Sequence, residues 1–183
     1  MTVRISRFFA GGLVSAAVVV TLSGCVGAPP LTIFAGLAER CFASTVTEQG
    51  SVALVGLTVA NESPRSVILR EVDIMHLENA TVDEISVVPM PSVYTIFGVA
   101  PGGELSPEQR ALYLDRRPVD GAVIEPGTSV EIVVELRADD YTEYAGLRGL
   151  SLRYDDGWFS ASSRAEAVVG FVPGWAHCGS RAR

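Results

Sequence analysis

The sequence has 183 residues, with 21 acidic and 14 basic side chains and a net charge of −7, a size typical of one domain with a sizeable core. The acidic balance repels nucleic acid and anionic lipid headgroups, which argues against a DNA or RNA partner. Every basic residue is arginine, which excludes sites that require lysine, such as a Walker A loop or a Schiff base.

The N-terminal residues have the pattern of an export signal. Arg4 and Arg7 precede an uncharged stretch of 15 residues, Phe8 to Leu22. A membrane-spanning helix needs about 20 apolar residues, so this stretch is too short to cross a bilayer comfortably. Its length and its basic start are instead typical of the apolar region of a signal peptide.

The apolar stretch ends in Leu22-Ser23-Gly24-Cys25, which resembles the lipobox of bacterial lipoproteins. The resemblance implies cleavage by signal peptidase II between Gly24 and Cys25, and attachment of diacylglycerol to the Cys25 thiol. Two acyl chains hold a protein on a membrane far better than one. The alternatives are an ordinary secretory peptide or an uncleaved anchor with a chance cysteine.

The expected mature chain begins at Cys25 and has 159 residues. Loss of residues 1–24 removes two arginines and no acidic residue, so its net charge becomes −9. Residues 25–30 form a short lipidated tether, and residues 31–183 are expected to form a single domain. We expect this domain to be a monomer held at the extracytoplasmic face of the plasma membrane by its lipid.

Beyond the tether, the sequence predicts β-strands separated by turn signals. Apolar and polar residues alternate most clearly in Ser129 to Arg137, as in a half-buried strand. Between Val67 and Ile74 the apolar phase slips by one residue, as a β-bulge would produce. Further strands are expected at residues 50–60, 82–88, 150–154, 158–161 and 165–172. Such strands predict an all-β fold, a two-sheet antiparallel sandwich.

One long connection interrupts this series of strands. It follows Pro89 and Pro91, which are expected to end the strand before it. Within it, Ser106-Pro107-Glu108-Gln109 has the form of a capping box with proline at the first helical position. The sequence therefore predicts a short helix, residues 107–116, inside an insertion that spans residues 91–126.

Three stretches resemble small immunoglobulin-like lipoproteins of high-GC Gram-positive bacteria: GLTVANESPRSVILREVDI, VIEPGTSVEIVVELR and GLRGLSLRYDDG. The shared motifs are a strand pair, a Pro-Gly turn and a hairpin that precedes a terminal cysteine. The resemblance covers about residues 50–178 and implies an immunoglobulin-like sandwich in an extracytoplasmic location. It implies no activity, and since the antibody Cys–Trp–Cys arrangement is missing, it concerns architecture only.

Two cysteines remain once Cys25 is lipidated, and both lie near the ends of the mature domain. Cys41 and Cys178 form an even pair in an oxidising compartment, which predicts a structural disulfide between the first and last strands. Free thiols or a metal pair are the alternatives. Neither cysteine has a His or Cys at the usual zinc-ligand spacing, which disfavours a metal pair.

Catalytic motifs are absent from the sequence. It contains no G-x-S-x-G, H-E-x-x-H or C-x-x-C. A Ser–His–Asp site would need His76 or His177, the only histidines. His76 continues the alternation of a strand, and His177 lies beside the expected disulfide. We therefore expect a non-catalytic protein without a cofactor, with an enzyme of unrecognised type as an alternative.

A metal or small-ligand carrier is the other alternative. Soft or borderline copper ligands are present at Met75, His76, Met90 and His177. Consecutive residues of a strand point to opposite faces, so Met75 and His76 are not expected to reach one ion. Core-filling methionines and unrelated histidines are the simpler interpretation.

Aromatic residues in or beside loops offer a candidate interaction surface. They are Tyr94, Phe97, Tyr113, Tyr141, Tyr144 and Trp158. Exposed aromatic residues can anchor a partner, but residues in such places more often cover the ends of a core. The sequence favours a membrane-anchored binding or envelope-assembly module, with its candidate surface on the insertion (residues 91–126) and the nearby loop, residues 139–144. The expected partner is another protein of the cell envelope.

Overall fold

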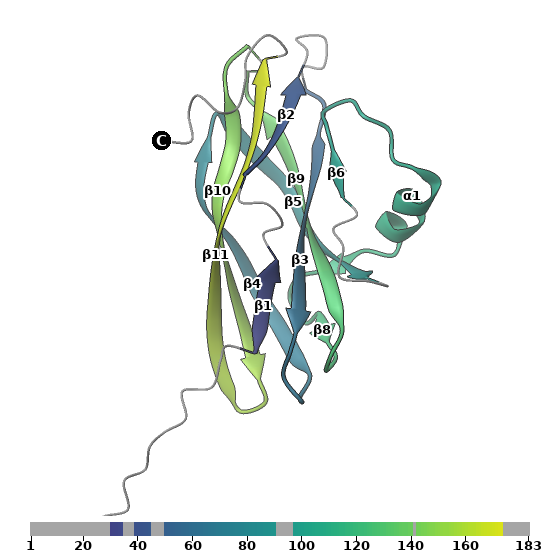
Figure 1. Ribbon diagram of the computed structural model, residues 1–183, viewed down its shortest axis with the longest axis vertical. Coiled ribbons are helices and arrows are strands. Elements are labelled where there is room, and N and C mark those ends of the chain that lie inside the picture. Colours follow the sequence, from purple (N-terminus) through teal and green to yellow (C-terminus); the bar gives the residue numbers. More distant parts are fainter. Residues whose placement is uncertain (1–29, 35–38, 45–49, 91–96, 141, 174–183) are drawn as a thin grey trace, which may run out of the picture.

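The computed structural model describes residues 30–34, 39–44, 50–90, 97–140 and 142–173 (Figure 1). The elements in chain order are β1 (Leu31–Phe34), β2 (Glu39–Ser44), β3 (Ala53–Asn61), β4 (Val67–Glu78), β5 (Ala80–Met90), β6 (Gly98–Val99), α1 (Pro107–Leu114), β7 (Arg117–Pro118), β8 (Val123–Ile124), β9 (Ser129–Ala138), β10 (Ala145–Asp156) and β11 (Phe159–Pro173). Among these described residues, no helix is long and apolar enough to cross a membrane.

The strands form two sheets that pack face to face (Figure 1). Sheet A has the order β1-β3-β9-β5-β7, and β6 also pairs with β3. Sheet B has the order β2-β11-β10-β4-β8. The predicted all-β, immunoglobulin-like sandwich with one short helix is therefore confirmed. One feature differs from the expected antiparallel pattern, because β2 runs parallel to β11.

The core lies between the sheets and is built from alternate residues of the long strands. In β9, Val130, Ile132, Val134 and Leu136 all belong to the buried cluster. In β10 the same cluster takes Leu147, Leu150, Leu152 and Tyr154. The alternation predicted for Ser129 to Arg137 is confirmed, since residues two apart on a strand share a face. In β10 the step of three residues from Leu147 to Leu150 spans the register shift at Gly149.

The predicted bulge in β4 is also confirmed. Glu71 lies opposite Arg153 and Leu69 lies opposite Tyr154, so that Arg70 is the extra residue. A bulged residue restores the inward direction of the next apolar side chain, and Val72 accordingly joins the core.

In two places the sequence predicted that a strand would stop and the structure continues it. Pro89 does not end β5, because it lies opposite Val130 inside the ladder with β9. The two strands expected at residues 158–161 and 165–172 are one strand, β11, whose register with β10 shifts at Gly149. A local irregularity in one long hairpin therefore looks like a break when only the sequence is read.

The predicted helix starts where the capping box places it. The Ser106 hydroxyl accepts the N–H of Gln109 at 3.1 Å, and the Gln109 side chain accepts the N–H of Ser106 at 2.9 Å. Pro107 is the first helical residue. The helix ends at Leu114, two residues earlier than predicted.

Asn79 turns the chain from β4 in sheet B to β5 in sheet A. Its φ of 46° lies in the left-handed region, which asparagine tolerates better than most residues. Its side-chain amide donates to the carbonyl groups of Asp140 at 2.9 Å and Tyr144 at 3.2 Å. These bonds fasten the candidate loop at residues 139–144 to the corner between the sheets.

Candidate functional site

The outer face of sheet A is covered by the insertion. A second apolar cluster contains Leu54, Val88, Phe97, Val99 and Val133, with Leu105, Leu112 and Tyr113 packed against it. Val133 alternates with core residues of β9, so it points away from the main core. The inner side of the insertion is therefore part of the folded structure.

A buried carboxylate lies beneath this cover. Glu131 is 0% exposed and lies between Thr58 of β3 and Val88 of β5. Its Oε1 accepts the backbone N–H of Phe97 at 2.9 Å, which ties the insertion to the sheet. Gly56 leaves the space that this side chain fills, because a Cβ at position 56 would overlap with the Glu131 carboxylate.

Two polar contacts fasten the end of α1 to the same face. The Tyr113 hydroxyl donates to Glu135, and the Arg116 Nε donates to Glu84 at 3.2 Å. The Arg116 guanidinium also lies over the Tyr113 ring, 4.2 Å from its centroid. Burial and the hydrogen bond to Glu135 raise the pKa of Tyr113 above its usual range, so its hydroxyl stays a donor.

The outward side of the insertion is exposed. Leu114, at the end of α1, is 76% exposed. The segment from Arg117 to Val123 borders a shallow hollow of about 260 Å³. We call the exposed residues Glu108, Arg110, Leu114 and Arg117 the insertion surface, whereas the exposed Val123 lies in β8 of sheet B. The insertion surface combines apolar and charged groups on a segment whose inner side is bonded to sheet A.

Sheet B, by contrast, has a polar outer face. Arg70 pairs with Asp155 at 2.6 Å, and Arg153 pairs with Glu71. The Ser160 hydroxyl donates to Asp155 at 2.7 Å, and this bond, together with Arg70, lowers the pKa of Asp155. These residues border a hollow of about 430 Å³. Cross-strand ion pairs of this kind are typical of a solvated sheet face.

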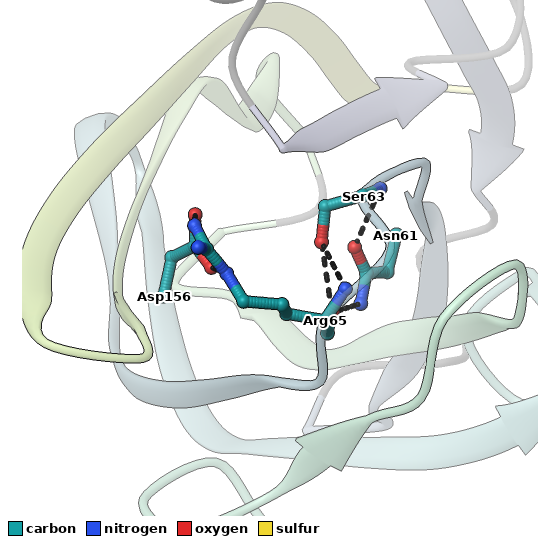
Figure 2. A network of polar contacts seen from close by, with 4 residues as sticks. All are labelled: Asn61, Ser63, Arg65 and Asp156. Carbon is teal, nitrogen blue, oxygen red and sulfur yellow. Dashed lines mark hydrogen bonds and ion pairs between the residues drawn. The ribbon is translucent and has the colours of Figure 1, made fainter.

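One end of the sandwich is organised by Asn61, the last residue of β3 (Figure 2). Its side-chain amide is buried and donates to the carbonyl groups of Arg65 at 2.7 Å and Ile124 at 2.8 Å. Its Oδ1 accepts the N–H of Ser63 at 3.0 Å. Asn61 therefore closes the turn that follows β3, and asparagine suits this position because its side chain both donates and accepts.

The β10–β11 hairpin ends beside this turn. Arg65 donates through Nε and Nη2 to the two carboxylate oxygens of Asp156, both at 2.9 Å (Figure 2). Gly157 and Trp158 connect the strands, and Gly157 has a φ of 66°. Trp158 is 98% exposed and Phe159 is 74% exposed. Two adjacent aromatic side chains thus face solvent at a hairpin whose base is fixed by an ion pair.

The aromatic residues have three different locations. Phe97 and Tyr113 cover the outer face of sheet A instead of an end of the core. Tyr144 packs over Gly146 and Gly170, where added Cβ atoms would overlap with its ring or hydroxyl. Trp158 is exposed, whereas Tyr94 and Tyr141 lie outside the described residues. The sequence singled out Trp158 but missed its neighbour Phe159, which the hairpin turn beside it could have indicated.

The copper candidates are not gathered into one site. Met75 and His76 border the same shallow hollow of about 450 Å³, which strict strand alternation did not predict. Arg148 and Glu166 also border this hollow, and their opposite charges give a cation no net attraction. Met90 belongs to β5 in the other sheet, and His177 lies outside the described residues. Within the described ranges, no group of three His, Cys, Asp or Glu side chains could hold a metal ion.

The lipidation and cleavage sites, Cys25 and Gly24, lie outside the described residues and stay predictions. So does the disulfide, because Cys178 lies outside them too. The backbone of Cys41 is in β2, opposite Gly170 of β11. The expected disulfide would therefore start from a strand that already neighbours the last strand, β11, in sheet B.

No protein-family model and no curated protein matches this sequence. Among solved structures, the chain is similar to the ASH/PapD-like domain 7 of human CEP192, with a TM-score of 0.44 and 11% identity over 94% of this chain and 100% of that chain. It is also similar to the YadV chaperone, with a TM-score of 0.40 and 9% identity over 79% of this chain and 52% of that one. The Vibrio cholerae VesB protease gives a TM-score of 0.38 and 10% identity, over 78% and 32% of the two chains. No activity is transferred from these proteins, two of which are much longer than the matched part.

Proposed function

We propose that this protein is a non-catalytic lipoprotein, anchored through Cys25 at the outer face of the plasma membrane, that binds another envelope protein through its insertion surface. The anchor is supported by the lipobox-like Leu22-Ser23-Gly24-Cys25 after a basic, apolar start. The sandwich fold is compatible with a binding or assembly role, and the argument for the surface comes from the insertion itself.

The attachment of the insertion carries the proposal. The Phe97 backbone bonds to buried Glu131, and Tyr113 and Arg116 bond to Glu135 and Glu84. A segment held from below loses little conformational entropy when its outer side binds a partner. Leu114 supplies an exposed apolar contact on this fixed segment. A partner with a small apolar site bordered by charges would fit it.

The anchor is tested by the mass of the protein extracted from its own membranes. We expect a chain that starts at Cys25 and carries diacylglyceryl, with or without a third acyl group. The Cys25→Ala variant should carry no diacylglyceryl, because the thiol is the site of attachment. An unmodified Cys25 in the mature protein would contradict the anchor.

The surface is tested by site-specific photo-cross-linking in intact cells. A photoreactive residue in place of Leu114 should give a discrete cross-linked partner, and one in place of Ser162, which is exposed on β11, should not. The Arg110→Glu substitution should weaken the product at position 114, since it reverses a charge beside the contact. Equal products from both positions, or none from position 114, would contradict the surface.

Deletion of the insertion is a poorer test. The insertion carries Val99, Leu105 and Leu112, which cover Leu54 and Val133. Removing it would expose apolar side chains and destabilise the sheet, so loss of a partner could follow from unfolding. Point substitutions on the exposed side avoid this ambiguity.

A further inference from the structure

The chain enters the sandwich at the end where the β10–β11 hairpin lies. The carbonyl of Pro30 accepts the N–H of Glu62 at 3.0 Å, and the Thr32 hydroxyl donates to Glu62 at 2.7 Å. Leu31, the first residue of β1, lies opposite Asn61. The start of β1 is therefore fixed to the turn between β3 and β4.

The hairpin reaches the same end. Asp156 lies opposite Val67, the first residue of β4, and forms an ion pair with Arg65 in the turn. In Figure 1 this hairpin is at the bottom of the molecule, next to the start of β1. Asp155 is also held, by Arg70 and Ser160, so both strands are braced just before the tip.

The side chains at the tip are suited to a lipid–water interface. Trp158 and Phe159 are the most exposed aromatic residues in the described part of the chain. Both expose apolar surface area to water, which is unfavourable. Tryptophan has an apolar body and one N–H donor, and it is enriched where membranes meet water. A two-residue loop at the end of a braced hairpin can enter such an interface without rearrangement of the domain.

The charge around the tip favours apolar insertion over attraction to anionic headgroups. Arg65 is already paired with Asp156. Glu62 and Glu125, which lie in the adjacent turns, are acidic. Negatively charged lipids would therefore attract this surface only weakly. The favourable free energy of membrane binding would come from burial of the aromatic side chains.

We propose that Trp158 and Phe159 insert into the headgroup region of the membrane that holds Cys25, and so orient the domain with this end toward the lipid. The inference rests on the proposed lipidation of Cys25. Six residue steps separate Cys25 from Leu31, so the start of β1 lies within about 20 Å of the lipidated cysteine even if the tether is fully extended. The tip of the hairpin is at this end, whereas α1 lies at the side of the sandwich, away from this end (Figure 1).

The test uses tryptophan fluorescence of the lipidated protein in phosphatidylcholine vesicles. The Trp175→Phe substitution leaves Trp158 as the single tryptophan. We expect a blue-shifted emission and quenching by lipids brominated near the headgroup. Quenching by acrylamide should be several-fold weaker than in the matched control protein. The matched control combines Leu114→Trp with Trp158→Phe and Trp175→Phe, and its single tryptophan should stay accessible to acrylamide.

The outcomes separate this inference from the proposed function. A protein whose mass shows no lipid on Cys25 would overturn both. A lipidated protein whose Trp158 stays accessible to acrylamide would overturn only the insertion of the hairpin, as would equal shielding of the Leu114→Trp control. Shielding of Trp158 in native membranes but not in vesicles would indicate a protein contact at the tip and would also overturn it.

Discussion

At the residue scale, Gly56 and Glu131 depend on each other, because the glycine leaves the space that the glutamate side chain occupies. The strand pattern predicts that Glu131 faces solvent, and the structure buries it completely. The strand pattern itself is right, because Glu131 does point away from the main core. The side chain is buried because the insertion, which is remote in sequence, returns to cover that face. A lone carboxylate beside a glycine on the next strand was the available signal, and it could be read only once the register was known.

We predict that Gly56→Ala destabilises the protein by about 2–4 kcal/mol, because the new methyl group must displace a buried, hydrogen-bonded carboxylate. Urea unfolding of the purified protein would measure the loss. The Glu131→Ala substitution should also destabilise, since the Phe97 N–H loses its acceptor. In the double variant the new methyl group at position 56 has space, because the carboxylate is gone. The double variant should therefore lose less stability than the sum of the losses in the two single variants. Additive losses would contradict this account.

At the scale of elements, local sequence signals predicted those features that depend on the residues of a single helix or strand. The capping box predicted the start of α1, and the phase slip between Val67 and Ile74 predicted the bulge in β4. Boundaries that depend on neighbouring strands were less predictable. Pro89 remains in β5 because its missing N–H is tolerated near the end of the ladder with β9.

The β10–β11 hairpin gives a prediction on pH. The hydrogen bond and charge of Arg65 lower the pKa of Asp156 below its ordinary 3.8. A lowered folded-state pKa stabilises the fold above the unfolded value, and that contribution disappears as the pH falls through the folded value. We therefore predict that Asp156→Asn lowers the melting temperature at neutral pH and that its difference from wild type shrinks as the pH falls below the ordinary pKa of 3.8.

The matched control for this prediction is Asp73→Asn, which removes the same charge from an exposed position on β4. Thermal unfolding followed by circular dichroism over the same pH range compares the two variants. A difference between Asp156→Asn and wild type that persists unchanged at low pH would show that the ion pair with Arg65 is not its cause.

For the whole molecule, alternation and turn signals were enough to predict a two-sheet sandwich, because each long strand has one apolar face that must be buried. They could not predict which outer face is covered. Sheet A is covered by the insertion, and sheet B carries Arg70, Asp155 and other charges. The parallel pairing of β2 with β11 was equally hidden, since nothing in a short strand specifies its partner.

The expected disulfide also acts on the whole molecule. β2 is an edge strand of sheet B and is six residues long, and its neighbour in the sheet order is β11. A short edge strand has few bonds to hold it. The backbone of Cys41 lies opposite Gly170, and Cys178 follows eight residues after Gly170 in the sequence. A bridge would fix β2 and close a loop of over a hundred residues.

We predict that the intact mass of the native protein is two hydrogens below that of the free thiols, and that the Cys41→Ser, Cys178→Ser and double variants all lose the same stability, about 4–5 kcal/mol in the chain-entropy account. Equal losses of stability in the three variants test the bridge more directly than the size of the loss does. If the cysteines form one bridge, either substitution removes it and the second costs nothing further. If they are separate buried thiols, the two losses add, and alkylation of the unfolded, unreduced wild type would label both.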